Sequence, residues 1–546
     1  MPIVNDENGR PYAVHLCKTD IAQNNNKFYD MELSNGWGAQ EFAVKLINGR
    51  IGYRGVTNFK YFGDLERAKK FFNQKFTEKT ALRWEERDNN PIPGKYVVVE
   101  LTHTAKPEVK KEEPVVKEEP KEPAQPEKKT RGRKKKVVEE PEIKKEIEEE
   151  IEEIDEKVKD LMRCICDEDI HLGLLRQLKF NEEYGKPIDC LSPAQIETGY
   201  EILAKIEESI GARRPARTST RNRAPLTALT ALVGSLPAAP VIPETRLQLT
   251  NKYYSLIPHA FGFAIPPRIE SLPQVQAERE LLDALKGCLE AAQNKKDAEN
   301  EDSKKDVYQR LYERLPCQLE QVSEDVKEKI GACLKMRGPT HLYNLSIIDA
   351  FKLKNPEDDV KKEEQEVPKK RPRRGRKAPE PNAEETSETI TRLLWHGTRV
   401  TNVFSILMNG LVFPEGDRYG LMFGNGVYFA NVPTKSANYC CPEASKRVFM
   451  LLCEVKVQNP LVLYQSEVNS DELIEKAGKD SVYAAGKHRP TGMVDIEGTL
   501  AFRDGLTEIP EQTALLYDEY VMFDKDRFNI KYVVEVNVEK MRRLPK

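Results

Sequence analysis

The stretches LLWHGTR (residues 393–399), MFGNGVYFA (residues 422–430) and TKSANYC (residues 434–440) decide the fold of the C-terminal part of this chain. The first stretch is an apolar run that ends at His396, and in the second a pair of glycines comes just before an aromatic strand at Tyr428. Polar groups at the ends of buried strands, beside glycines that allow close backbone approach, are typical of a small-molecule pocket. We therefore expect the rest of the chain either to complete this pocket or to control access to it.

A fourth motif, LLYDEYVMFD (residues 515–524), places Glu519 in an apolar strand pattern. Short apolar segments separated by turns fill much of the chain after residue 300, and such segments with few long helices predict a two-sheet α+β core. We expect this domain to span residues 301–546, with a charged surface insertion at about residues 355–390 that costs little closure entropy.

The composition is too polar for a chain that is globular throughout. Of the 546 residues, 39% are hydrophobic and 32% are charged, so part of the chain is expected to be linker. The 86 basic and 89 acidic residues nearly cancel, to a net charge of −3, and this total singles out no class of partner. Ten cysteines without metal-ligand spacing predict free thiols in a reducing compartment and no metal. The lack of a secretory signal, and the prolines that break the most apolar window (residues 224–243), predict a soluble intracellular protein with no membrane contact.

The first 101 residues predict a small mixed α/β domain. Alternating apolar residues at 28–33 and 41–47 indicate antiparallel strands, and helical spacing of apolar residues follows Asp64, a suitable N-cap. Lys69 and Lys70 lie on the exposed face of that helix. A basic helix face is usually only solvated, and phosphate contact is the alternative.

Two basic clusters lie in segments that are too charged and proline-rich to fold alone. The linker at residues 102–142 ends in TRGRKKK (residues 130–136), and the later insertion carries KKRPRRGRK (residues 369–377). Clusters of this kind are typical of nuclear localisation signals or nucleic-acid tethers, and a merely soluble spacer is the alternative. Two of them favour a nuclear protein with non-specific affinity for DNA.

Residues 143–300 predict an all-α domain. Apolar residues three or four apart indicate one continuous helix over residues 143–165, and a second helix begins at the capping pattern of Ser192 with Gln195. A third apolar stripe starts at Val275, after an arginine-rich and proline-rich insertion at about residues 211–245, which is expected to be disordered. Aliphatic stripes of this kind are ordinarily core packing and carry no catalytic signature.

Taken singly, a histidine at a strand end is ordinarily a packed core residue, but the four C-terminal motifs occur as an ordered set. In this order and spacing they resemble the ADP-ribosyltransferase fold of DNA-dependent poly(ADP-ribose) polymerases. The passage from GRIG (residues 49–52) through Trp84 is similar to the WGR domain of that family, with Trp84 matched as a packing residue. The helices near His259 resemble its helical regulatory domain, which blocks the NAD site until DNA binding loosens it. The resemblance implies three domains joined by the charged segments.

The resemblance also implies NAD+ as the donor and a role for each motif residue. The Gly397 backbone and the Ser436 hydroxyl would hold the nicotinamide carboxamide, and Tyr428 with Tyr439 would stack on its ring. Glu519 would bind the nicotinamide ribose and stabilise positive charge as nicotinamide leaves. The implied NAD contacts are His396, Gly397, Thr398, Asn402, Tyr428, Ser436 and Tyr439, and the implied catalytic residues are His396, Tyr428, Lys435 and Glu519.

For the WGR-like domain, the resemblance implies contact with DNA ends and nicks. Gly49 and Arg50 match the motif, while Asn48 stands in place of its tryptophan. We expect Gly49, Arg50, Lys69 and Lys70 to contact DNA. The expected enzyme is nuclear and modifies itself and other nuclear proteins, and an accessory factor for serine targets is left open.

Two other functions remain open from the sequence. One is a mono-ADP-ribosyltransferase, although His396, Tyr428 and Glu519 together form the set that the family associates with polymer elongation. The other is a DNA-end scaffold whose transferase fold has lost its activity. Product length would separate the first from a polymerase, and NAD+ consumption would separate the second.

Overall fold

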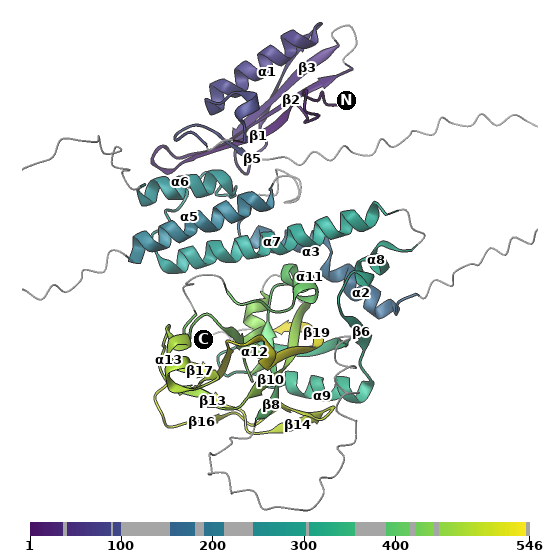
Figure 1. Cartoon of the computed structure of the whole chain (residues 1–546), viewed down its shortest axis with the longest axis vertical. Helices are drawn as coiled ribbons and strands as arrows, with labels where there is room; N and C mark the ends of the chain where they lie inside the picture. Colours follow the sequence, from purple (N-terminus) through teal and green to yellow (C-terminus); the bar gives the residue numbers. More distant parts are fainter. Residues whose placement is uncertain are drawn as a thin grey trace, which may run out of the picture. The chain divides into compact units, whose positions relative to one another are not determined.

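The computed structural model describes residues 1–36, 41–88, 91–99, 153–180, 191–211, 244–301, 305–354, 389–414, 421–441 and 447–541. These residues form an N-terminal sheet with one helix, a set of helices, and a C-terminal α+β part (Figure 1). The predicted linker, both basic clusters and nearly all of the two predicted insertions lie outside the described residues. No helix in the described ranges is both long enough and apolar enough to cross a membrane.

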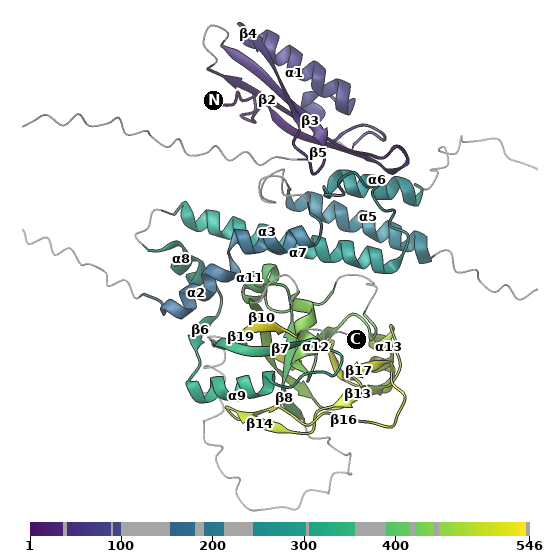
Figure 2. The ribbon, with the colours of Figure 1, turned by 180° about the vertical axis from the view of Figure 1, so that it is seen from behind.

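The N-terminal part is a five-stranded antiparallel sheet in the order β4-β3-β2-β1-β5, with helix α1 across one face (Figures 1 and 2). Its elements are β1 (Ala13–Asp20), β2 (Asn25–Asn35), β3 (Phe42–Arg50), β4 (Val56–Phe62), α1 (Leu65–Thr80) and β5 (Val97–Val99). Asp64 caps α1 as predicted, because its carboxylate accepts the Arg67 N–H at 3.0 Å.

The two faces of this sheet are packed differently. Side chains alternate along a strand, so Val14 and Leu16 point into the core that contains Phe72 of α1, while Cys17 points to the opposite face. Trp84 is 3% exposed and stacks on the Tyr12 ring with centroids 5.2 Å apart, which agrees with its predicted packing role.

The helical part contains α2 (Glu156–Ile165), α3 (Glu168–Gln177), α5 (Pro193–Gly211), α6 (Arg246–Leu256), α7 (Leu272–Glu299) and α8 (Val307–Glu313). Helix α5 packs against both α6 and α7, and the three lie side by side in both views (Figures 1 and 2). The predicted cap of α5 is confirmed, because the Ser192 N–H donates to Gln195 Oε1 at 2.8 Å and the Gln195 N–H donates to Ser192 Oγ at 3.3 Å. His259 is buried with both ring nitrogens bonded, to the Ile257 carbonyl at 2.7 Å and to Glu278 at 2.9 Å.

The prediction of one continuous helix over residues 143–165 is wrong at Ile154. The Asp155 carboxylate accepts the Lys157 N–H at 2.7 Å, so the helix begins at Glu156 and Ile154 precedes its cap. The apolar period runs on through this cap, and a periodicity alone cannot show where a capping side chain ends the helix. Residues 143–152 lie outside the described residues.

The C-terminal part is built on a seven-stranded sheet in the order β14-β15-β8-β10-β19-β7-β6. Helix α9 (Glu324–Leu334) packs in the cluster on one face of this sheet, and α11 (Val400–Asn409) packs in the cluster on the other. The strands are β6 (Gln318–Gln321), β7 (Tyr343–Lys354), β8 (Ile390–Gly397), β10 (Arg447–Val457), β14 (Met493–Ile496), β15 (Thr499–Phe502) and β19 (Phe528–Lys540).

The second sheet layer has a four-stranded part, β11-β12-β18-β9, and a three-stranded part, β16-β13-β17. Only Ala485 separates β12 from β13, and only Asp518 separates β17 from β18, so the two parts continue into each other. The predicted two-sheet α+β core is confirmed, with its smaller layer divided at these residues. The bounds are β9 (Val427–Phe429), β11 (Leu461–Leu463), β12 (Ser481–Ala484), β13 (Gly486–Arg489), β16 (Thr507–Glu508), β17 (Leu515–Tyr517) and β18 (Glu519–Met522), with α12 (Pro433–Ala437), α13 (Ser470–Ala477) and the short turn η4 (Asn438–Cys440) between strands.

Candidate active site

His396 is held at the point where the two sheets join. Trp395 of β8 and Ala430, just after β9, exchange backbone hydrogen bonds of 2.8 and 2.9 Å, which ties the two layers together. His396 Nδ1 lies 2.9 Å from the Tyr428 carbonyl, and since a carbonyl only accepts, Nδ1 carries the proton. Burial lowers the pKa of His396, against the opposing effect of this hydrogen bond. The ring is therefore neutral at pH 7 and presents Nε2 as an acceptor, which suits a ribose hydroxyl.

Gly397 and Ser436 form a close backbone contact on which the site depends. A side chain at position 397 would overlap the Ser436 carbonyl oxygen, so only glycine lets α12 approach the end of β8. Ser436 is buried, and its hydroxyl donates to the Trp395 carbonyl at 2.9 Å. The hydroxyl oxygen is then left to accept, as binding of a carboxamide NH2 group requires.

Lys435 and Glu519 form a buried ion pair beside this contact. Their Nζ and Oε1 atoms are 2.9 Å apart, and Lys435 Nζ also donates to the Tyr517 carbonyl at 2.7 Å. Glu519 begins β18 and is only 7% exposed. Burial lowers the pKa of Lys435, while the charge of Glu519 opposes that shift. The pair holds a carboxylate at a fixed place with little water around it, where its field is stronger than at the surface.

Two predicted ring-stacking residues have different surroundings. The Tyr428 hydroxyl donates to the Gly424 carbonyl at 2.8 Å and accepts the Phe423 N–H at 3.0 Å, so this ring is fixed by the glycine-rich turn. The Tyr439 side chain is 61% exposed and leaves ring surface for a ligand.

The remaining predicted NAD contacts lie where α11 meets helix α7. Asn402 Nδ2 lies 3.5 Å from Thr398 Oγ1, and Thr401 Oγ1 donates to Asn402 Oδ1 at 3.1 Å. A side chain at Gly287 of α7 would collide with the Thr401 carbonyl and would lie 2.8 Å from Asn402 Oδ1. Glycine at this position brings α7 directly onto Asn402, one of the predicted NAD contacts.

An ion pair that the motifs did not predict also joins α7 to the residue just before α11. Arg399 Nη2 lies 2.6 Å from Glu280 Oε2 of α7, and Arg399 Nε lies 3.3 Å from Cys441 Sγ. Arg399 ends the LLWHGTR motif, so its position could have suggested a role, whereas Glu280 is one of many acidic residues on α7 and carries no signal of its own. In short, the structure brings His396, Gly397, Tyr428 and Ser436 together, pairs Lys435 with Glu519, and places Asn402 against α7 with Thr398 beside it.

Three family models match the chain over most of its length. They describe a poly(ADP-ribose) polymerase catalytic domain at residues 323–538, a poly(ADP-ribose) polymerase regulatory domain at residues 153–312 and a WGR domain at residues 12–91. The chain is 64% identical over 551 residues to "Poly [ADP-ribose] polymerase 2" of Caenorhabditis elegans, with 99% of each chain covered. The chain belongs to the poly(ADP-ribose) polymerase family.

More distant members match as well. "Poly [ADP-ribose] polymerase 2" of Homo sapiens is 27% identical, over 96% of this chain and 79% of that protein. "Poly [ADP-ribose] polymerase 1" of Danio rerio is also 27% identical, over 97% of this chain and 45% of that protein. This polymerase therefore has the predicted three-domain architecture and uses NAD+ as its substrate. The exact domain bounds and the role of each site residue remain predictions.

Two of the predicted DNA contacts of the polymerase lie at the end of β3, next to the helical part. The Arg50 guanidinium donates to the carbonyls of Gly262 at 2.5 Å and Ala264 at 3.0 Å, and to the Asn24 carbonyl at 2.8 Å. A side chain at Gly49 would lie 2.8 Å from the Phe28 ring and 2.9 Å from the Gly55 Cα atom, so glycine is needed for this close packing. In this structure the Arg50 side chain links the N-terminal sheet to the loop before α7. Its contact with DNA stays a prediction.

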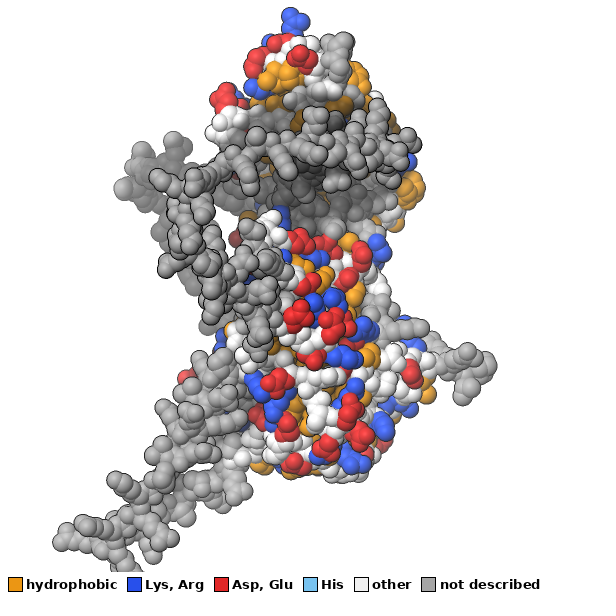
Figure 3. Space-filling model, turned by 90° about the vertical axis from the view of Figure 1, so that its right-hand side faces the viewer, with side chains coloured by type: hydrophobic (Ala, Val, Ile, Leu, Met, Phe, Trp, Pro, Cys, Tyr) orange, Lys and Arg blue, Asp and Glu red, His pale blue; other side chains and the backbone are white. Residues whose placement is uncertain are grey.

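The other two predicted DNA contacts lie on α1. Lys69 pairs with Glu66 at 3.1 Å, and Lys70 is exposed. On the face shown in Figure 3, basic and acidic side chains alternate over the described residues, so charge alone does not mark a DNA track there. DNA contact by these lysines also stays a prediction.

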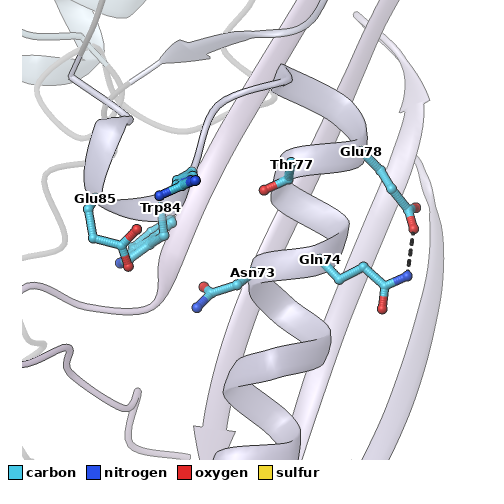
Figure 4. Close-up of a pocket in the computed structure, with 7 residues that line it drawn as sticks. Asn73, Gln74, Thr77, Glu78, Trp84 and Glu85 are labelled. Atoms are coloured by element: carbon cyan, nitrogen blue, oxygen red, sulfur yellow. Dashed lines mark hydrogen bonds between the residues drawn. The ribbon is translucent and has the colours of Figure 1, made fainter.

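A hollow in the N-terminal part lies between α1 and the short turn η2 (Trp84–Glu86) (Figure 4). Gln74 on its rim donates to Glu78 at 3.1 Å. The hollow is lined by Asn73, Gln74, Thr77, Glu78, Arg83, Trp84 and Glu85. None of these residues belongs to the predicted NAD site, so this hollow is separate from the pocket of the polymerase. The described residues also hold no group of three or more His, Cys, Asp or Glu side chains that could bind a metal ion.

The contact between Gly397 and Ser436 can be tested directly. Gly397→Ala should lower NAD+ turnover by about a hundredfold, because the added methyl pushes α12 and the nicotinamide-binding groups out of place by a distance on the order of 1 Å. Gly173→Ala is the matched control, since nothing lies within 4 Å of a side chain added there. Turnover of the Gly397 variant equal to that of the control would contradict the assignment.

Proposed function

We propose that this polymerase is activated by DNA breaks and builds poly(ADP-ribose) on itself and on other nuclear proteins, releasing nicotinamide. The observation that carries the chemical part is the buried Lys435–Glu519 pair beside His396, Gly397 and Ser436. The WGR match and the family of the relatives support the DNA-dependent part.

In the proposed reaction the chain supplies placement and one negative charge. The neutral His396 ring accepts a ribose hydroxyl through Nε2, and the Ser436–Gly397 contact holds the carboxamide of nicotinamide. Nicotinamide leaves as a neutral molecule while positive charge develops on its ribose, and the Glu519 carboxylate stabilises that charge. Glu519 also polarises the acceptor hydroxyl, and Lys435 keeps the carboxylate in place.

Control of the reaction is proposed to pass through α7. This helix covers Thr401 and Asn402 through the Gly287 contact, and Glu280 anchors it to Arg399. NAD+ therefore competes with α7 for the adenosine side of the pocket. Any event that loosens α7 raises the fraction of molecules that can bind NAD+.

The contacts of the N-terminal sheet with the helical part support a route for a DNA signal to this helix. Arg50 bonds to the loop at Gly262 and Ala264, which leads directly into α7, and the Thr19 N–H donates to Ser255 of α6 at 2.8 Å. DNA that draws Arg50 away removes bonds that hold this loop. We propose DNA ends and nicks as the trigger and the nucleus as the place of action.

The role of Glu519 predicts a loss of polymer growth on substitution. Glu519→Gln keeps the shape of the side chain but removes its charge, so chain extension should fall by about a hundredfold to a thousandfold. The measurement is polymer length on a sequencing gel after incubation with labelled NAD+. Glu511→Gln, at an exposed position, is the matched control. Long polymer from the Glu519 variant would refute the mechanism, and a mono-ADP-ribosylated product would identify a role in elongation alone.

The ion pair between Glu280 of α7 and Arg399 predicts a variant that is active without DNA. Glu280→Gln removes one partner of a charge-assisted hydrogen bond, so NAD+ turnover without DNA should rise on the order of tenfold. Glu270→Gln is the control, because Glu270 pairs with Arg268 and lies outside the contact between α7 and Arg399. Unchanged turnover without DNA in the Glu280 variant would contradict the proposed lock.

A further inference from the structure

The helical part packs against the face of the N-terminal sheet opposite α1 and forms a seam with it. A single apolar cluster joins residues of the sheet to residues of the helices. Polar bonds run alongside it, since Thr19 N–H donates to Ser255 Oγ at 2.8 Å and Ile21 N–H donates to Asn251 Oδ1 at 3.0 Å. From the sheet the cluster contains Cys17, Ile21, Phe28, Ile51 and Val99, and from the helical part it includes Leu175, Phe180, Leu249, Tyr253 and Tyr254.

Three side chains at this seam form a row: the Cys17 thiol as nucleophile, the His15 imidazole as base and the Asp30 carboxylate beside it. Cys17 and His15 lie two residues apart on β1 and share one face, and Asp30 is the direct partner of His15 on β2. Cys17 Sγ lies 3.1 Å from His15 Nε2, while His15 Nδ1 contacts the Asp30 carboxylate. Cys17 is completely buried, and the Asp30 side chain is 28% exposed.

The imidazole in this array is suited to hold a proton. Burial alone would lower the pKa of His15, but charge on the Cys17 sulfur and the hydrogen bonds that the ring makes to Asp30 and Cys17 raise it to about 10. By contrast, burial without such a partner raises the pKa of the Cys166 thiol to about 12. A thiolate beside an imidazolium is the reactive form of cysteine, whereas buried thiols in apolar surroundings are inert.

We propose that Cys17 is a modification site, a thiol activated by His15 and Asp30 that reacts with soft carbon electrophiles when the helices lift from this face of the sheet. All three groups belong to the sheet itself, on β1 and β2, so the array keeps its geometry while the seam opens. The closed seam hides the sulfur, and the proposed ADP-ribosyl transfer does not use it. This inference stands without the proposed DNA activation.

The reaction with an α-haloamide balances within the site. The proton shared by Cys17 and His15 stays on His15 Nε2, and the sulfur lone pair forms a bond to the methylene carbon as the carbon–iodine bond breaks. Iodide leaves with the electron pair, and the imidazolium remains paired with Asp30 until water takes its proton. The bulky thioether then occupies space that the closed seam fills with helix side chains, so the modification also keeps the seam from closing fully.

Pulse labelling of the full-length protein with iodoacetamide at pH 7, followed by peptide mass spectrometry, tests the proposal. Cys17 should be alkylated about tenfold faster than Cys288, a buried cysteine of α7 in the same apolar cluster, because the His15 imidazole 3.1 Å from the Cys17 sulfur activates it. Asp30→Asn should slow labelling of Cys17 about fivefold, as should His15→Gln, because both withdraw support from the imidazolium.

Glu32→Gln is the matched control for Asp30→Asn. Glu32 is a carboxylate two residues along the same strand that pairs with Lys45 at 3.6 Å instead of with His15, and its variant should label Cys17 at the wild-type rate. Equal rates for Cys17 and Cys288, or equal effects of the Asp30 and Glu32 substitutions, would overturn the proposal and leave the array as a packing feature. If His15→Gln does not fold, the partly exposed Asp30 position still decides the outcome.

Discussion

The contact between helices α7 and α11 is the constraint on which the rest of this structure depends. Gly287 lets α7 come down onto the Thr401 carbonyl, and the Glu280–Arg399 ion pair fixes it there. The same approach places a helix of the regulatory part against Asn402, one of the predicted NAD contacts. In the proposed mechanism this packing contact also restricts the substrate site. We expect that a change at the other end of the helical part can loosen the contact between α7 and α11.

The chemistry itself depends on how two sheets meet. The backbone exchange between Trp395 and Ala430 fixes the end of β8 against β9, and this sets both the tautomer of His396 and the position of Ser436. Glu519 arrives from the other layer at the start of β18 and is held by Lys435. In the proposed mechanism the fixed, buried carboxylate needs no reorganisation as charge develops on the ribose, and such preorganised charge lowers the barrier.

Local features of the structure could be predicted from the sequence, and long-range ones only through the family resemblance. The Ser192–Gln195 cap follows from neighbouring residues, and so does the helix that begins after Asp64. The start of α2 was missed because Asp155 interrupts an apolar period that continues on both sides of it. The direction of the Arg50 side chain could not be predicted, since it depends on strand register and on a loop more than two hundred residues away along the chain. The pairing of Lys435 with Glu519 has the same character, because α12 and β18 meet only in the folded sheets.

The central claim is that α7 governs access of NAD+ to the pocket and that DNA breaks act by loosening it. Hydrogen exchange of peptides from α7, measured together with NAD+ turnover in the same samples with and without nicked DNA, tests this claim most directly. The account predicts that nicked DNA accelerates exchange across α7 and raises turnover in parallel. A rise in turnover while α7 keeps its full protection would contradict it.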